Sequence, residues 1–314
     1  MKSYGTKLKK FIYTSLLVLQ AGIVVTGGAV RLTGSGLGCP TWPECTPGSF
    51  TPVPHQAQGT LHVWIEFSNR LLTFALVIAS IAALAGAIKW SKDRSDRKLV
   101  RLLALGQFLG IFAQGVLGGI TVLTKLNPIP VAGHFLLSIP LIAGALSLRQ
   151  RMLGRTAERK QSSTLNPTTI ALTKFLVPLT AIVITLGTVV TGSGPHAGDE
   201  QAKRFGFDTR MISWLHADVV IALISLTLAL LLVNRVSSES KANTSFTKAV
   251  ALFLAVSLGQ GSIGYIQYFT GLPELIVGLH LLGSTLVWTS AWNIKLVGNI
   301  SYFNRESTGS AHGA

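Results

Sequence analysis

The sequence predicts an all-α membrane protein in which eight transmembrane helices form two pseudo-symmetric four-helix bundles. The first observation is the composition, because 48% of the 314 residues are hydrophobic and only 12% are charged. The mean hydropathy of +0.50 is too high for a soluble domain of this size. The second observation is that apolar runs of about 20 residues, long enough to cross a bilayer, recur along the chain. The third observation is an internal repeat, in which the second half of the chain matches the first.

The predicted spans follow one another at short intervals. They are expected at 11–31, 61–88, 102–123, 129–148, 170–191, 211–233, 249–269 and 274–294. Lys7, Lys9 and Lys10 precede the first span, as basic residues precede the apolar part of a signal peptide. That span is too long for a signal peptide and has no small-residue cleavage site, so we expect it to remain as a helix.

The net charge of +15 is explained by membrane topology and does not indicate a nucleic acid partner. Basic residues gather at the amino terminus and in alternate loops, around 2–10, 89–101, 149–160, 235–248 and 295–305. This positive-inside pattern predicts a plasma membrane protein surrounded by lipid, with both termini in the cytoplasm. The loops expected outside are 32–60, 124–128, 192–210 and 270–273.

The repeat places a glutamine, a glycine and a histidine at equal spacing in both halves. Gln114-Gly115 is followed by His134, and Gln260-Gly261 is followed by His280 at the same distance. Gly118 and Gly264 also match between the copies. A histidine in hydrocarbon is costly, so its occurrence at the same place in each copy indicates two ligand sites.

The domain organisation follows from the repeat and from one polar segment. We expect an N-terminal bundle at 1–149, a cytoplasmic linker at 150–168, a C-terminal bundle at 169–296 and a cytoplasmic tail at 297–314. The motif Thr-Gly-Ser-Gly ends the first helix at 33–36 and the fifth helix at 191–194. Glycine there permits a left-handed backbone and close approach, or simply caps the helix.

Three histidines are expected at one depth near the outer face. His134, His216 and His280 each lie about five residues into a span, roughly 8 Å below the outer boundary at about 1.5 Å per residue. If their helices face each other, His216 and His280 are able to bind a haem iron from opposite sides. Zinc or copper is less suited because no further His, Cys or carboxylate lies near them in the sequence. The alternative is a hydrogen bond from each histidine to a neighbouring helix.

The two halves differ at one position. Asn69 stands where the second half has His216, and asparagine does not ligate haem iron. His62, two turns earlier, is a substitute ligand at the membrane edge. Glu66 lies one turn before Asn69, where it either pairs with Arg70 or acts as an acid, base or charge-stabilising group. The asymmetry suggests that one half holds a fixed cofactor and the other a substrate.

The chain has two cysteines, Cys39 and Cys45, both in the first outer loop. A disulfide is plausible on the oxidising side of the membrane. It would act as a structural staple or in redox chemistry, and the spacing does not distinguish these roles.

Several motifs together resemble the haem A synthase family, from about residue 11 to residue 296. They are Gly28-Ala-Val-Arg-Leu-Thr-Gly-Ser-Gly-Leu-Gly-Cys-Pro-Thr-Trp-Pro-Glu-Cys45, Glu66-Phe-Ser-Asn-Arg70, Val190-Thr-Gly-Ser-Gly-Pro-His-Ala-Gly-Asp199, Trp214-Leu-His-Ala-Asp218 and Gly278-Leu-His280. The resemblance implies two pseudo-symmetric four-helix bundles. It also implies the conversion of haem O to haem A, for cytochrome oxidase, by oxidation of a ring methyl to a formyl group.

By this resemblance, His216 and His280 ligate a resident haem B in the C-terminal half. Cys39 and Cys45 match the pair that forms a disulfide in bacterial members. The implied partners are haem O as substrate, haem A as product, haem O synthase and an unidentified electron donor.

The resemblance places the substrate haem in the N-terminal half, at a site with His134, Asn69 and Arg70. Glu66 is implied to lie close to the methyl group that is oxidised. Many members carry histidine where this chain has Asn69, so His134 is expected to be the only protein ligand of the substrate haem.

We expect the methyl group to undergo two successive hydroxylations, after which the diol loses water to give the aldehyde. Haem supplies the oxidative chemistry and the protein supplies orientation and electrostatics. The alternatives are a haem-binding cytochrome in electron transfer, a membrane thiol oxidoreductase that uses Cys39 and Cys45, and a transporter.

Overall fold

The computed structural model describes residues 2–57, 59–154, 165–236 and 244–298. Within these ranges the chain forms eight helices and no strand, and each helix is long and apolar enough to cross a membrane. The helices are α1 (Lys2–Leu32), α2 (Thr60–Trp90), α3 (Arg97–Leu123), α4 (Pro128–Met152), α6 (Pro167–Ser193), α7 (Thr209–Val236), α8 (Thr244–Phe269) and α9 (Glu274–Val297). The prediction of an all-α, multi-pass membrane protein is confirmed.

Most helices extend beyond the predicted spans. Helix α1 begins at Lys2, nine residues before the predicted span, and α4 continues to Met152. Hydropathy identifies only the part of a helix inside hydrocarbon, while the backbone continues to hydrogen-bond within the helix as it enters the polar interface. The helices are therefore longer than the apolar runs that predict them.

Two helices begin at an Asn-Pro pair. The side chain of Asn127 accepts a hydrogen bond from the Ile129 N–H at 3.0 Å, and Asn166 accepts one from the Thr168 N–H at 2.8 Å. Proline occupies the first helical position in both helices, where its missing N–H is not needed. These caps set the first residue of α4 and of α6.

The predicted linker and tail lie mainly outside the described residues. Of the linker at 150–168, residues 155–164 are not described, while its two ends belong to α4 and α6. Of the tail at 297–314, residues 299–314 are not described, and Val297 ends α9.

The two Thr-Gly-Ser-Gly motifs adopt different conformations. Helix α1 ends before Thr33, and Gly34 has a φ of 67°, which is left-handed backbone. Helix α6 continues to Ser193, and Gly194 has a φ of −83°. A left-handed backbone is therefore present at the first motif only, although the two sequences are identical.

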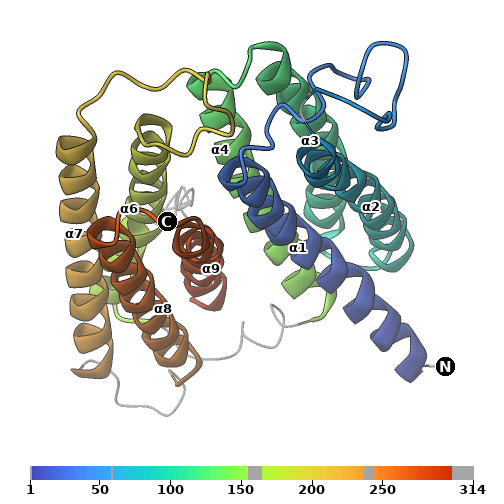
Figure 1. Cartoon of the computed structure of the whole chain (residues 1–314). Coiled ribbons are helices and arrows are strands. Elements are labelled where there is room, and N and C mark those ends of the chain that lie inside the picture. Colours follow the sequence, from blue (N-terminus) through green and yellow to red (C-terminus); the bar gives the residue numbers. More distant parts are fainter. Residues whose placement is uncertain (1, 58, 155–164, 237–243, 299–314) are drawn as a thin grey trace, which may run out of the picture.

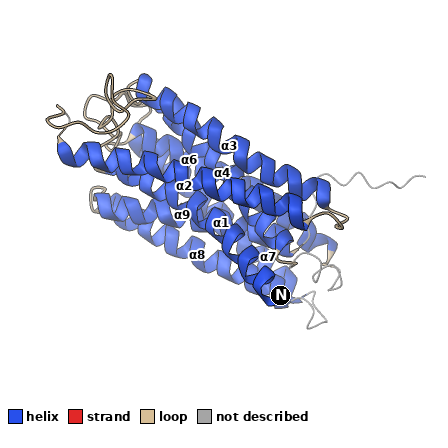
Figure 2. Cartoon of the chain, turned by 90° about the vertical axis from the view of Figure 1, so that its right-hand side faces the viewer, coloured by secondary structure: helices blue, strands red, loops and turns tan. Residues whose placement is uncertain are grey.

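Neighbouring helices pack as antiparallel hairpins. Contacts join α1 with α2, α3 with α4, α6 with α7, and α8 with α9. Figure 1 shows α1 to α4 on one side of the molecule and α6 to α9 on the other. Figure 2 shows that the helices run along a common direction, with loops at their ends. We call the side where α2, α4, α7 and α9 begin the histidine side, because the three buried histidines lie near it.

Helices α4 and α9 form the main polar contact between the two groups of helices. The Trp288 indole N–H donates to the Ile139 carbonyl at 2.8 Å, and the Trp292 indole N–H donates to the Ser147 hydroxyl at 2.8 Å. Half of the apolar window of α4 is buried, more than in any other described span. Helix α4 is thus packed between neighbours, whereas the other helices leave more surface for lipid.

Large hydrophobic side chains cover the outer faces of the helices. Phe74, Ile78, Phe112 and Leu232 are among those that are exposed. An apolar surface this extensive would be unstable in water and suits contact with lipid chains.

Candidate functional site

Each of the three buried histidines lies about two turns from the start of its helix. His134 and His280 are six residues beyond the first residues of α4 and α9, and His216 is seven residues beyond the first residue of α7. At about 1.5 Å per residue they lie roughly 9–10 Å from the helix starts. The predicted common level is therefore reproduced, because these helices all begin on the histidine side.

Each imidazole rests against a glycine of the preceding helix. A Cβ atom built on Gly118, Gly187 or Gly264 would lie 3.3, 3.2 or 3.1 Å from the Cε1 atom of His134, His216 or His280, respectively. These distances are shorter than ordinary van der Waals contact. Glycine is thus the residue that lets each ring approach the neighbouring backbone. We call these three glycines the glycine seats.

The imidazoles are partly buried and are not fully hydrogen-bonded. The Nδ1 atoms of His134, His216 and His280 have no hydrogen-bond partner among the described residues. Main-chain carbonyls of Val183 and Gln260 approach the rings of His216 and His280, in a geometry that falls short of a hydrogen bond. His134 has no such contact among the described residues, so the alternative that each histidine simply bonds a neighbouring helix is not supported at His134.

His216 on α7 and His280 on α9 both belong to the second group of helices. Their rings are close enough to interact electrostatically. Two unpaired imidazoles at one level fit a haem iron, which takes an axial ligand on each side. Among the described residues there is no group of three or more His, Cys, Asp or Glu side chains suited to a bare metal ion.

The repeated glutamines support the helices that carry the histidines. Gln260 donates to the His280 carbonyl at 2.7 Å. Gln114 donates to the Ser138 hydroxyl at 2.8 Å, and that hydroxyl donates to the His134 carbonyl at 3.4 Å. The Gln-Gly…His repeat is thus a helix-to-helix contact that positions the histidine backbone, made directly in one copy and through a serine in the other.

Asn69 is bound within its own half. Its Oδ1 atom accepts a hydrogen bond from the Thr26 hydroxyl at 2.7 Å, and its Nδ2 atom lies beside Gly27 of α1. The position that matches His216 therefore also faces a glycine on the preceding helix. His62, the substitute ligand, has its Nδ1 atom 3.0 Å from the Ser35 hydroxyl.

Glu66 and Arg70 form a salt bridge with an N–O distance of 2.7 Å. The other carboxylate oxygen of Glu66 accepts a hydrogen bond from the Cys39 N–H at 2.7 Å. Arg70 also donates to the carbonyls of Cys39, Thr41 and Glu44. The predicted pairing of Glu66 with Arg70 is present, and this pair holds the cysteine loop against α2.

Cys39 and Cys45 form a disulfide, as predicted, with 4.3 Å between their Cα atoms. Both cysteines are fully buried. Trp42, between them, lies against Gly119 of α3, so the loop contacts two helices. A disulfide exchanges with thiols only when one sulfur is accessible, so its burial favours the structural role over thiol oxidoreductase chemistry.

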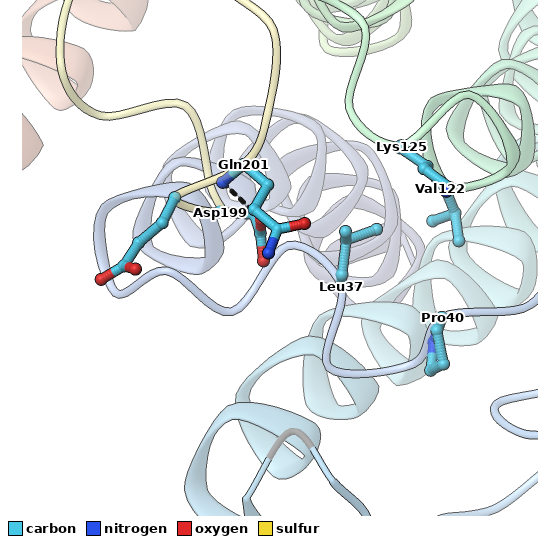
Figure 3. A pocket seen from close by; sticks show the side chains of 7 residues that line it. Leu37, Pro40, Val122, Lys125, Asp199 and Gln201 are labelled. Atoms are coloured by element: carbon cyan, nitrogen blue, oxygen red, sulfur yellow. Dashed lines mark hydrogen bonds between the residues drawn. The ribbon is translucent and has the colours of Figure 1, made fainter.

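A pocket of about 420 Å³ opens on the histidine side (Figure 3). Its walls come from the first loop, the end of α3 and the α6–α7 loop: Leu37, Pro40, Val122, Lys125, Asp199, Glu200 and Gln201. None of the three buried histidines lines it. The pocket is therefore separate from the histidine sites.

The glycine seats were not predicted from the sequence as part of the site. The match between Gly118 and Gly264 in the repeat was a usable signal. Gly187 gave none, because the helix that carries it follows a different spacing from its counterpart.

The fold and the site define a class of protein: an all-α, multi-pass membrane protein with unpaired histidines buried at one level. The COX15-CtaA family model, described as cytochrome oxidase assembly protein, matches residues 10–292. The chain therefore belongs to this family.

Several relatives carry the name heme A synthase. The one from Geobacillus thermodenitrificans is 28% identical over 151 residues, which are 48% of this chain and 44% of the relative. The one from Shewanella oneidensis is 27% identical over 290 residues, with 79% of this chain and 85% of the relative covered. The one from Methylobacterium radiotolerans is 30% identical over 229 residues, with 63% and 60% covered. The chain thus spans less than half the length of the Geobacillus relative.

Proposed function

We propose that the protein is a haem A synthase, which oxidises a ring methyl group of haem O to the formyl group of haem A. The observation that carries the proposal is the set of three buried imidazoles, each with an unpartnered Nδ1 atom and a glycine seat. Membership of the family and the names of the relatives support it.

The second half, residues 169–296, is proposed to hold a resident haem B. His216 on α7 and His280 on α9 would hold its iron, since their rings lie close enough to interact electrostatically. Haem with two histidine ligands supplies one-electron transfer. The glycine seats Gly187 and Gly264 would let each ring pack closely against the neighbouring helix.

The first half, residues 1–149, is proposed to bind the substrate haem O. His134 would be its only protein ligand, because the Asn69 side chain is bonded to Thr26 and an amide is a poor ligand for haem iron. Arg70 contributes to this site indirectly, through the loop that it holds over α2. One coordination position of the substrate iron is then left open.

Glu66 is proposed to act on the reacting methyl group electrostatically. The carboxylate is held by Arg70 and by the Cys39 N–H, so it keeps its orientation while charge develops on the substrate. A carboxylate in an ion pair is a weak base, which favours stabilisation of positive charge over proton transfer.

The substitution Glu66→Gln tests this role. It should stop formation of haem A and leave resident haem B bound, because the side chain keeps its shape and loses its charge. Chromatography of extracted haems measures both quantities. Glu44→Gln is the control, since Glu44 lies in the cysteine loop and its carboxylate accepts a hydrogen bond from the Gly48 N–H. A Glu66→Gln protein that forms haem A at the full rate would exclude the proposed role.

The topology proposed for the plasma membrane places both termini in the cytoplasm and the histidine side outside. The alternation of basic loops in the sequence supports this orientation. A reporter enzyme active only in the cytoplasm, fused after residue 314, should be active. An inactive reporter on a folded fusion protein would reverse the assignment.

The function itself is tested by expressing the full chain with a source of haem O and separating the extracted haems. A haem A synthase yields haem A together with haems B and O. A haem-binding cytochrome yields haem B alone, and a thiol oxidoreductase yields none.

A further inference from the structure

Two guanidinium groups meet where the two groups of helices join on the histidine side. Arg31, in the last turn of α1, donates from Nη2 to the Thr191 carbonyl at 2.8 Å and from Nε to the His196 carbonyl. Arg204, in the α6–α7 loop, donates from Nη2 to the Pro195 carbonyl at 2.7 Å. Both groups therefore rest on the same short segment of backbone, and they are close enough to repel each other electrostatically.

No carboxylate neutralises this pair among the residues that the structure describes. The ion pairs found there involve only Glu66 and Asp96 as acids. Asp199, the acid closest in sequence to that backbone segment, accepts a hydrogen bond from the Gln201 N–H and forms no described ion pair. Each guanidinium has five N–H donors, so both retain donors after their contacts with the backbone. Two half-buried like charges are costly, and a bound anion would remove that cost.

The guanidinium pair lies one helical turn beyond the level of His216 and His280. On α6, Thr191 follows the glycine seat Gly187 by four residues, which is about 6 Å along the axis. On α1, Arg31 follows Gly28 by three residues, and Gly28 meets the side chain of Leu281, the neighbour of His280. Two helices thus independently place the pair just outside the histidine level, towards the helix ends.

We propose that Arg31 and Arg204 bind the propionate carboxylates of the haem held between His216 and His280. The inference rests on the proposed function and adds an anchor at the other end of the same cofactor. Haem carries both propionates on one edge, so iron bound at the histidine level can present both to one cationic pair. Guanidinium groups match carboxylates in geometry, because two parallel N–H donors reach both oxygens.

The test compares haem with a derivative that lacks the anionic groups. The full chain, purified without haem in detergent, is titrated with iron protoporphyrin IX and with its dimethyl ester, and Soret absorption reports binding. The variants are Arg31→Gln and Arg204→Gln. Lys203→Gln is the matched control, because Lys203 is an exposed cation next to Arg204. Comparing the ratio of the two affinities between variants cancels any difference in how the probes partition into detergent.

Each arginine substitution should weaken the free acid about tenfold, the effect expected for loss of one charged contact, and should leave the ester unchanged. Lys203→Gln should change neither affinity. An equal loss of affinity for the free acid and the ester would mean that the arginines only support the fold. That result would reject the propionate contacts but not the proposed binding of haem. If the variants fail to fold, equal affinity of the unmodified protein for acid and ester rejects the anchor. If neither probe binds the unmodified protein, the proposed function fails as well.

Discussion

At the scale of the residue, the glycine on the preceding helix determines where each imidazole lies. Gly118, Gly187 and Gly264 leave room that any side chain would fill. The histidine rings then contact the backbone of the preceding helix, while their Nδ1 atoms have no hydrogen-bond partner among the described residues. A buried polar atom without a partner costs free energy, so three such atoms at one level support the proposed haem sites.

The substitution Gly264→Ala should weaken binding of the resident haem. The added Cβ would lie 3.1 Å from Cε1 of His280, so the ring must shift by a few tenths of an ångström. Crowding of this kind costs about 1–3 kcal/mol, and we expect a loss of that order in haem affinity, measured by Soret titration. Gly261→Ala is the control, because a Cβ there meets no atom within 4 Å. Equal haem affinity of the Gly264→Ala and Gly261→Ala proteins would contradict a role for Gly264 in positioning His280.

The substitution Asn69→His should add a second axial ligand for the substrate haem. Histidine would restore the residue that the second half has at this position, and Gly27 beside it matches the other seats. Haem O bound to the variant should become six-coordinate and low-spin. Optical spectra of the bound haem measure this change. A spectrum identical to that of the unmodified protein would place position 69 outside the haem site.

At the scale of the element, short loops are held by charged side chains at helix ends. Arg70 holds the cysteine loop by several carbonyls. On the opposite side of the molecule, Asp96 precedes α3 and pairs with Arg94 at 2.8 Å and with Arg151 of α4 at 3.2 Å. Hydrogen bonding from Arg94 is the main reason that the pKa of Asp96 is lowered.

This shift predicts the pH dependence of one contribution to stability. Because the pKa of Asp96 is lower in the folded protein, its contribution is present above the unfolded value, about 3.9, and is lost as the pH falls through the folded pKa. Asp96→Asn should lower the free energy of unfolding by about 0.5–1 kcal/mol at neutral pH, and the difference should vanish in acid. Thermal melting in detergent measures it. Asp93→Asn, at an exposed neighbour, should have no effect; an equal loss there would indicate a general charge effect.

At the scale of the whole molecule, α9 joins the two groups of helices by packing against both α1 and α4. Trp288 and Trp292 of α9 hydrogen-bond α4. Each of these two helices also carries a histidine, so the join that holds the halves together also fixes the two sites relative to each other. The sites should nevertheless bind independently, because their seats lie on different helices.

Single histidine substitutions should therefore separate the two sites. His216→Ala should reduce resident haem B to background. His134→Ala should keep haem B and abolish formation of haem A. Haem content and haem A yield are measured on the same preparations, with His55→Ala, an exposed loop histidine, as the control. Loss of haem B in His134→Ala would show that the two halves do not bind haem separately.

Much of this architecture was predictable from the sequence. Eight apolar runs required eight helices, since a backbone in hydrocarbon must satisfy its own hydrogen bonds. Equal spacing of His134 and His280 from their loops placed them at one level. The ends of the helices were less predictable, because polar residues at the interface continue a helix without any hydropathy signal.

The sequence by itself determined the helices, the level of the histidines and the absence of a histidine at Asn69, because all of these depend on local composition and on spacing along the chain. Only the tertiary structure decided that Gly187 faces His216, that the Cys39 N–H donates to Glu66, and that Arg31 lies beside Arg204. These contacts join segments that are far apart in the sequence. Helix packing determines which side chains meet. The spacing of residues along the chain does not predict these contacts.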